Sequence, residues 1–215
     1  MIRLRWTSVP DTGRAAVHFR TESALVSRIV AEAPLDRRAA RTRLALSEAL
    51  IELLGERGWD DIAVQDVCER ADVARSTFYL HYDGKEALLQ GGFDGLRAAL
   101  KANALGSAAA AKGWSGFTFV AGLAEHVQQN RRIFRSVVGR RSGHAVHQRF
   151  REMIVRLIDD ELPPGDGVLP RDARARCLGA LLTELLGWWV DQGAKDAGAL
   201  AARFNRAAAA LLAVR

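Results

Sequence analysis

Apolar residues recur at three- and four-residue steps along most of this chain, the spacing that places one hydrophobic stripe on an α-helix. No stretch alternates between apolar and polar residues for long enough to predict a sheet strand. The pattern therefore predicts an all-α fold. Beyond a helix-rich segment that ends near residue 89, it predicts helices over 114–138, with a possible break at Asn130, and over 147–162, 171–192 and 196–214, and a loop over 102–112.

Residues 64–89 have the pattern of two short amphipathic helices joined by a tight turn, followed by the start of a third helix. Asp72 lies at the turn, and Asp tolerates the left-handed backbone better than most residues. The second helix, predicted over 75–82, buries Phe78 and part of Tyr82. This arrangement is a helix-turn-helix. The stripe of its first helix consists of Val64, Val67, Cys68 and Ala71.

The outward face of the second helix carries a guanidinium, two hydroxyls, a phenol and an imidazole, where an ordinary solvent face carries Glu and Lys. Arginine donates two hydrogen bonds to guanine, hydroxyls bond to base edges, and Tyr and His reach phosphate oxygens. These groups favour contact with DNA over a buried helical hairpin that happens to have a polar face. They belong to Arg75, Ser76, Thr77, Tyr79 and His81.

The segment resembles the DNA-binding domain of the TetR family of bacterial transcriptional regulators. The run ALIELLGERGWDDIAVQDVCERADV is similar to the family's first helix and its entry into the second, and FYLHYDGKEALL is similar to its recognition helix and the start of its fourth helix. Ala63, Asp72 and Ala74 depart from the family's usual Thr cap, turn Gly and Ser cap. Each lost capping oxygen costs about 1 kcal/mol, so local helix ends are weakened while the domain still folds.

The resemblance implies a DNA-binding unit over residues 36–89 and a helical effector-binding and dimerisation domain over 90–215, with residues 1–35 as a flexible extension. It implies that bases are approached by one residue of the second family helix and three of the recognition helix. Phosphates would be held by the residues that follow and by a basic lead-in on the first helix. The implied DNA-binding residues are Arg41, Arg43, Gln65, Arg75, Ser76, Thr77, Tyr79, His81, Tyr82 and Lys85.

Residues 171–192 are more apolar than one buried helix face requires, which indicates a second partner for this helix. TetR-like proteins pair through their last two helices, so the resemblance implies a homodimer that places two recognition helices on a palindromic operator. It also implies a pocket for an unidentified small-molecule effector. The candidate lining residues, for which plain core packing is the alternative interpretation, are Trp114, Phe117, His126, Phe134, Trp188 and Trp189.

Charge supports nucleic-acid binding only weakly. The chain carries a formal net charge of +6, yet residues 36–86 contain eight Lys or Arg and eleven Asp or Glu. The local placement of charge therefore matters more than the total. The two cysteines, Cys68 and Cys177, are predicted to be small core residues in a reducing cytosol, with a thiol sensor as the alternative.

The sequence thus predicts a cytoplasmic, ligand-responsive homodimeric repressor that binds double-stranded DNA, uses no cofactor or metal, and contacts no membrane. No nucleophile motif, phosphate loop or metal-ligand spacing indicates an enzyme. Two alternatives remain open. One is a helical small-molecule-binding protein that has lost sequence-specific DNA binding, and the other is an all-α enzyme that uses His126 as an acid or base.

Overall fold

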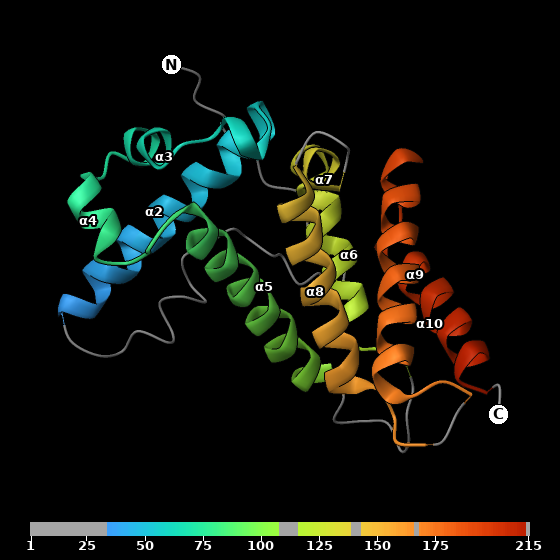
Figure 1. Ribbon diagram of the computed structural model, residues 1–215. Coiled ribbons are helices and arrows are strands. Elements are labelled where there is room, and N and C mark those ends of the chain that lie inside the picture. The colour runs from blue at the N-terminus through green and yellow to red at the C-terminus, as the bar shows by residue number, and fades with distance from the viewer. Residues whose placement is uncertain (1–33, 108–115, 139–142, 166–167, 214–215) are drawn as a thin grey trace, which may run out of the picture.

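The computed structural model describes residues 34–107, 116–138, 143–165 and 168–213. Every regular element within these ranges is a helix, which confirms the all-α prediction. The helices form two groups, with α2, α3 and α4 on one side and α6 to α10 on the other, and α5 runs between them (Figure 1). None of the described helices is long and apolar enough to cross a membrane.

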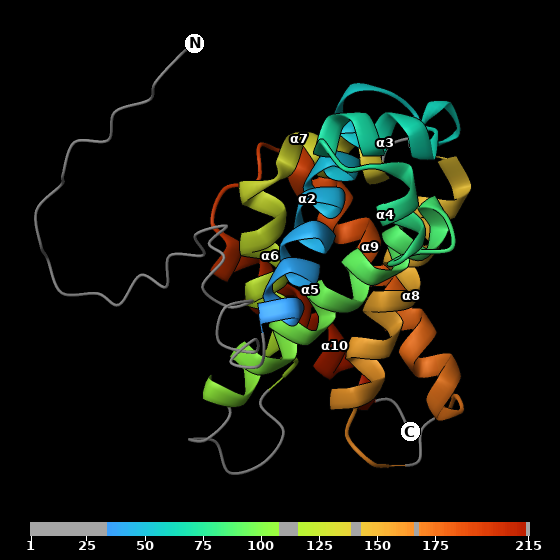
Figure 2. The same ribbon diagram turned by 90° about the vertical axis from the view of Figure 1, so that its left-hand side faces the viewer.

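The N-terminal unit consists of α2 (Pro34–Glu56), the short 3-10 helix η1 (Trp59–Asp61), α3 (Val64–Ala71) and α4 (Arg75–Tyr79). Figure 2 views this unit from its outer side, in front of the other helices. Its core joins residues of all four elements. The buried residues at the centre of that core are Leu46, Leu50, Leu53, Trp59, Ile62, Val67, Cys68 and Phe78.

The turn between α3 and α4 has the geometry that the sequence predicts. Asp72 adopts a left-handed backbone with φ 53° and ψ 46°. The N–H of Val73 donates to the carbonyl of Cys68 over 2.9 Å, and the Val73 side chain packs on the N-terminal core. Helix α4 ends at Tyr79, three residues earlier than the predicted end at 82, because the chain turns there toward α5.

Helix α5 (Lys85–Ser107) corrects one prediction, since it continues through the first part of the segment predicted to be a loop. Alanine has the highest helix propensity, so an Ala-rich stretch with little side chain to pack prolongs a helix that has already begun. The remainder of that predicted loop and Trp114 fall in 108–115, outside the described residues, as do residues 1–33.

The other helices lie close to their predicted positions. They are α6 (Phe119–Gln129), α7 (Arg131–Val138), α8 (Gly143–Glu161), α9 (Arg171–Asp191) and α10 (Ala197–Ala213). The predicted break at Asn130 is confirmed, because Asn130 caps α6 and its side-chain amide donates to the carbonyl of His126 over 2.9 Å. Pro163 and Pro164 follow the end of α8, as expected for residues that cannot continue a helix.

A second core holds α6 to α10 together around fully buried aromatic and aliphatic side chains, among them Phe117, Phe119, Leu123, Ile154, Leu157 and Phe204. The two cores meet where α5, α7 and α8 approach α2. Phe93 of α5 packs against both cores, and Val146 of α8 is buried in the N-terminal core. The N-terminal unit is therefore fixed to the other helices by apolar contacts, and any change at this junction acts on both sides.

The cysteines divide between core and surface. Cys68 is buried, as predicted, and burial raises the pKa of its thiol. The prediction for Cys177 was wrong, because this residue is exposed on α9. Apolar residues cover more than one side of α9, so an apolar stripe in its sequence does not identify the side that faces the core.

Candidate nucleic-acid interface

Helix α4 is held by one buried ring, which determines the residues that face solvent. Phe78 is fully buried, and its ring lies edge-on to Tyr79 at 5.4 Å and tilted to Tyr82 at 5.9 Å, centroid to centroid. With Phe78 inward, Arg75, Ser76 and Tyr79 are exposed and Thr77 is half-buried. The structure thus brings the predicted base-contacting residues of this helix together on one open surface.

Arg75 and Tyr79 are neighbours one helical turn apart. The guanidinium carbon of Arg75 lies 5.9 Å from the centre of the Tyr79 ring. Hydrogen bonding to Tyr79 raises the pKa of Arg75 further above its already high ordinary value. The guanidinium is therefore always charged, and its contact with the phenol restricts its orientation. This restriction lowers the conformational entropy that the guanidinium would lose on donating to a base or a phosphate.

Leu80 is a residue of this surface that the sequence analysis missed. Its side chain is 81% exposed, directly after the last residue of α4. The sequence did offer a signal for this residue, because Leu80 lies off the apolar stripe of the predicted amphipathic helix. An exposed aliphatic side chain beside hydrogen-bonding groups suits contact with a thymine methyl group.

The residues after α4 are less open than the sequence indicates. Tyr82 is half-buried, and its ring lies so close to Gly91 of α5 that a Cβ at that position would be 3.3 Å from the Tyr82 Cε1 atom. Burial raises the pKa of Tyr82, against the effects of the Arg43 charge and a hydrogen bond with Ser47. Tyr82 thus braces α2 against α5, and His81 beside it is also half-buried.

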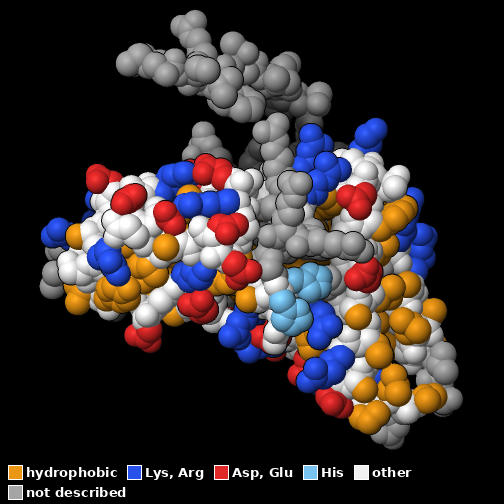
Figure 3. Space-filling view, turned by 45° about the horizontal axis from the view of Figure 1, so that its top comes forward, with side chains coloured by type: hydrophobic (Ala, Val, Ile, Leu, Met, Phe, Trp, Pro, Cys, Tyr) orange, Lys and Arg blue, Asp and Glu red, His pale blue; other side chains and the backbone are white. Residues whose placement is uncertain are grey.

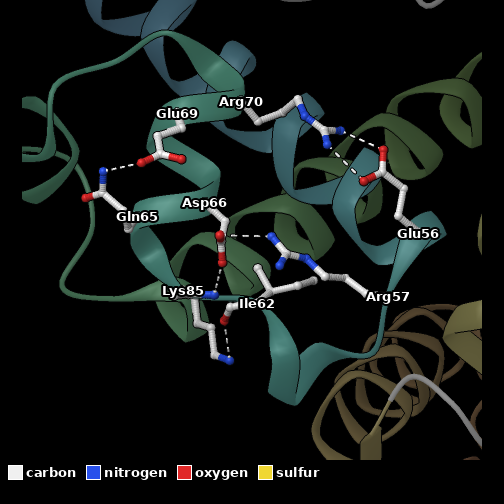
Figure 4. A network of polar contacts seen from close by, with 9 residues as sticks. Glu56, Arg57, Ile62, Gln65, Asp66, Glu69, Arg70 and Lys85 are labelled. Carbon is white, nitrogen blue, oxygen red and sulfur yellow. Dashed lines mark hydrogen bonds and ion pairs between the residues drawn. The ribbon is translucent and has the colours of Figure 1, made fainter.

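Lys85 begins α5 but its ammonium points back into the protein (Figure 4). The Nζ atom donates to the carbonyls of Trp59 and Ile62, each over 2.8 Å, and lies 4.5 Å from the centre of the Trp59 ring. Two of its three N–H bonds therefore hold η1 against α5. A phosphate would have to bind through the third.

Two arginines of the N-terminal unit form ion pairs with acidic residues. Arg70 donates to both carboxylate oxygens of Glu56 over 2.9 Å and to Glu52 over 3.2 Å, and this pairing raises the pKa of Arg70 and lowers that of Glu56 (Figure 4). Arg57 lies 3.0 Å from Asp66. These pairs tie α3 to α2 and neutralise carboxylates of a unit that has more acidic than basic residues.

The missing cap of α3 is partly replaced by a bond that the sequence analysis did not foresee. Ala63 has no side-chain oxygen, but its own N–H donates to Asp66 Oδ2 over 2.7 Å. This bond, followed by the one from Arg57, lowers the pKa of Asp66.

Gln65 on α3 is exposed and donates to Glu69 over 2.6 Å. Arg41 and Arg43 are exposed on α2.

The predicted effector residues that the structure describes are scattered, and His126 and Phe134 are the two that line the cavity between the N-terminal unit and the other helices. A hollow of about 460 Å³, here called the junction cavity, lies between α2, α5, α6, α7 and α8, with His126 and Phe134 in its wall. Phe117 and Trp189 are buried in the core of the C-terminal helices, Trp188 is 49% exposed, and Trp114 is outside the described residues. The residues of α2 and α5 that line the cavity could not be recognised in the sequence, because they belong to ordinary apolar helix stripes.

Comparison with known proteins agrees with the geometry of the N-terminal unit. The profile of bacterial regulatory proteins of the tetR family matches residues 46–91. YxbF, an uncharacterised HTH-type transcriptional regulator of Bacillus subtilis (strain 168), is 42% identical over 60 residues, which are 27% of this chain and 16% of that protein. The chain thus spans about a sixth of the length of this curated relative.

Solved structures resemble most of the chain. A TetR transcriptional regulator from Streptococcus agalactiae 2603V is 25% identical with a TM-score of 0.57, covering 80% of this chain and 96% of that one. FadR from Bacillus subtilis, solved in complex with stearoyl-CoA, shares the fold at 18% identity and a TM-score of 0.56, covering 79% and 97%. The tetR profile over residues 46–91, the YxbF match and the Streptococcus agalactiae structure, together with the geometry of α3 and α4, support a TetR-family transcriptional regulator.

Proposed function

We propose that the protein is a cytoplasmic, homodimeric transcriptional repressor that binds a palindromic operator and releases it when a small molecule binds. The observation that carries the proposal is the set of exposed hydrogen-bonding side chains on α4, held outward by buried Phe78 within the segment that matches the tetR profile. Residues 36–89 would bind DNA, and residues 90–215 would bind the effector and the second subunit.

In this proposal α4 enters the major groove. Arg75 donates to a guanine, and Ser76 and Thr77 contact neighbouring bases together with Gln65 of α3. Tyr79, His81 and the free N–H of Lys85 bind phosphates, and Tyr82 holds α4 in place. Arg41 and Arg43 contact the backbone or the minor groove from α2. Each good base contact is worth about 1–3 kcal/mol of discrimination, so Arg75 should dominate sequence preference.

The dimer interface would use the outer side of α9 and α10. Hydrophobic side chains gather on the right-hand part of the molecule in Figure 3, where these two helices lie. Trp188 of α9 and Leu211 of α10 are 49% and 54% exposed, respectively. Large exposed apolar residues on adjacent helices are typical of a surface that a second subunit covers. A dimer also supplies the second recognition helix that specific binding at physiological salt requires.

Ligand response would be geometric. Helix α5 begins six residues after the end of α4 and reaches the core of the C-terminal helices, so a shift of α5 would change the separation of the two α4 helices in a dimer. The solved FadR relative holds stearoyl-CoA, which supports the proposal of a small-molecule effector but not its identity. A preference of about 3 kcal/mol for the released conformation lowers operator affinity about a hundredfold.

Selection of random duplex DNA by the purified protein, at two salt concentrations, tests this function. We expect a palindromic motif, and we expect Arg75→Ala to bind the selected duplex at least tenfold more weakly. Tyr79→Phe keeps the ring but removes the hydroxyl, so it should weaken binding without changing the motif. Enrichment of no motif, or binding that disappears with salt and ignores Arg75, would contradict sequence recognition.

A further inference from the structure

The junction cavity lies between the two cores of the molecule. One wall is the N-terminal unit, through Leu50, Ile51 and Leu54 of α2. The opposite wall comes from α5 to α8 and includes Phe93, Phe134 and Phe150. Ile51 is 43% exposed although it faces apolar neighbours across the cavity. An occupant of this space would therefore touch the helix that carries α3 and α4, as well as the regulatory helices.

The lining restricts the charge of an occupant. Its side chains are mostly aliphatic and aromatic, and none of the lining residues that the structure describes is a Lys or Arg. Glu48 and Glu52 of α2 line the same space, and Glu52 is shared with Arg70. An anionic group would lose its hydration there and meet carboxylates in place of cations, which is unfavourable on both counts. The cavity thus selects against anions.

A few polar groups can orient a ligand. His126 lies in the wall and is largely buried, and burial lowers its pKa, so the imidazole is neutral near pH 7 and offers one donor and one acceptor. One of the two side-chain N–H groups of Asn130 donates to the His126 carbonyl, and the Asn130 side-chain oxygen is an acceptor for a ligand. A predominantly apolar pocket with a few such groups, at about 460 Å³, has the size and composition of a small-molecule site.

We propose that the junction cavity binds an uncharged, mostly apolar small molecule that hydrogen-bonds to His126 and contacts α2 of the N-terminal unit directly. The binding step stands independently of the DNA-binding function. Its regulatory consequence rests on the proposed function. A ligand bound between α2 and the helices α5 to α8 sets the position of the N-terminal unit directly. A shift of α5 is then not the only way in which ligand binding changes the position of α4.

Two fluorescent probes with one aromatic skeleton test the charge preference. N-phenyl-1-naphthylamine is uncharged and has one N–H donor, whereas 1-anilino-8-naphthalenesulfonate adds a sulfonate to the same skeleton. We expect saturable binding of the neutral probe to the full-length protein and at least tenfold weaker binding of the anionic probe. Equal or tighter binding of the sulfonate would overturn the predicted ligand class.

Two glycines of α5 provide a matched pair of variants that locates the bound probe. A Cβ at Gly92 or at Gly95 would meet no atom within 4 Å, so both positions accept a larger side chain, but only Gly92 lines the cavity. Gly92→Leu should lower the affinity for the neutral probe at least tenfold, and Gly95→Leu should leave it within twofold. His126→Leu, which keeps the bulk and removes the hydrogen bond, should lower it about fivefold. Equal binding by all three variants would place the probe elsewhere and refute the site.

Hydrogen exchange of backbone amides tests the contact with α2. We expect the neutral probe to slow exchange in the part of α2 that lines the cavity, residues 47–54, in the wild type and in Gly95→Leu but not in Gly92→Leu. Probe binding that protects α5 to α8 and leaves α2 unchanged would refute the direct contact. None of these measurements uses DNA, so failure of the cavity proposal and failure of the DNA-binding proposal are separate outcomes.

Discussion

The imidazole of His126 is the residue-scale feature with a direct consequence for pH. Burial is the cause of its lowered pKa, which means that the folded protein resists protonating it. As pH falls below the unfolded value near 6.5, the unfolded chain takes up this proton first, so folding stability decreases in that range and levels off below the folded pKa. The protonated form is disfavoured only in the folded state.

Urea unfolding of the wild type and His126→Leu at pH 7.5 and pH 5.5 measures this effect. The wild type should lose up to about 1 kcal/mol more stability than the variant between the two pH values. The variant shares every other ionisable group with the wild type, so it corrects for their contributions to the pH dependence. An identical pH dependence in the two proteins would show that His126 ionises freely in the folded state.

Lys85 makes contacts within the protein that the sequence alone did not indicate. Its ammonium bonds to two backbone carbonyls of the N-terminal unit and covers the Trp59 ring. Lys85→Met removes these charge-assisted bonds and leaves both carbonyls without this donor, so we expect a loss of about 2 kcal/mol in the free energy of unfolding.

Lys101→Met is the matched control for that variant, because the Lys101 ammonium donates to the surface carboxylate of Asp160 over 3.1 Å and its loss should cost about 0.5 kcal/mol or less. Chemical denaturation of both variants gives the comparison. Equal losses would indicate that Lys85 is solvated rather than bonded to η1.

At the scale of elements, α8 and α9 approach closely at Gly179. A Cβ at this position would lie 2.7 Å from Cγ2 of Val155, so either the Val155 side chain or the two helices must shift if a side chain is added. Gly179→Ala should therefore destabilise the protein by about 1–2 kcal/mol, even though alanine is the better helix former. Calorimetry or denaturant unfolding measures the change.

Val155→Ala removes the clashing methyl group and serves as the test of cause. In the double variant the cost of Gly179→Ala should largely disappear, which gives a coupling energy of about 1 kcal/mol or more between the two sites. Simple additivity of the two losses would mean that the alanine is accommodated without contact between α8 and α9.

The whole molecule leaves an apolar surface on α9 and α10 that the monomer does not bury. Trp188→Glu places a charge in the proposed interface, so we expect a monomer by light scattering at micromolar concentration and loss of binding to a palindromic duplex, with the helical content retained. Leu80→Ser alters an apolar residue that is even more exposed, directly after α4 and distant from α9 and α10, and should remain dimeric. A dimeric Trp188→Glu protein would place the interface elsewhere.

Local spacing was sufficient for most of the fold. Helix positions followed from the three- and four-residue apolar rhythm, and the turn at Asp72 and the break at Asn130 followed from residues with known backbone preferences. The exposed side of α4 was also predictable, because Phe78 is the one large apolar residue in its five positions and must point inward. These features depend on contacts between residues only a few positions apart, so they can be predicted from the order of residues alone.

Tertiary structure decided the rest, because it depends on which helix faces meet. The predicted effector aromatics could not be divided by composition into core, cavity and surface, since all three environments use the same residue types. The orientation of Lys85, the exposure of Cys177 and the α2 wall of the junction cavity likewise depend on partners distant in the chain. The sequence by itself determined an all-helical protein with a helix-turn-helix whose second helix carries exposed hydrogen-bonding side chains, whereas the packing of α2 against α5 to α8 decided where the junction cavity lies.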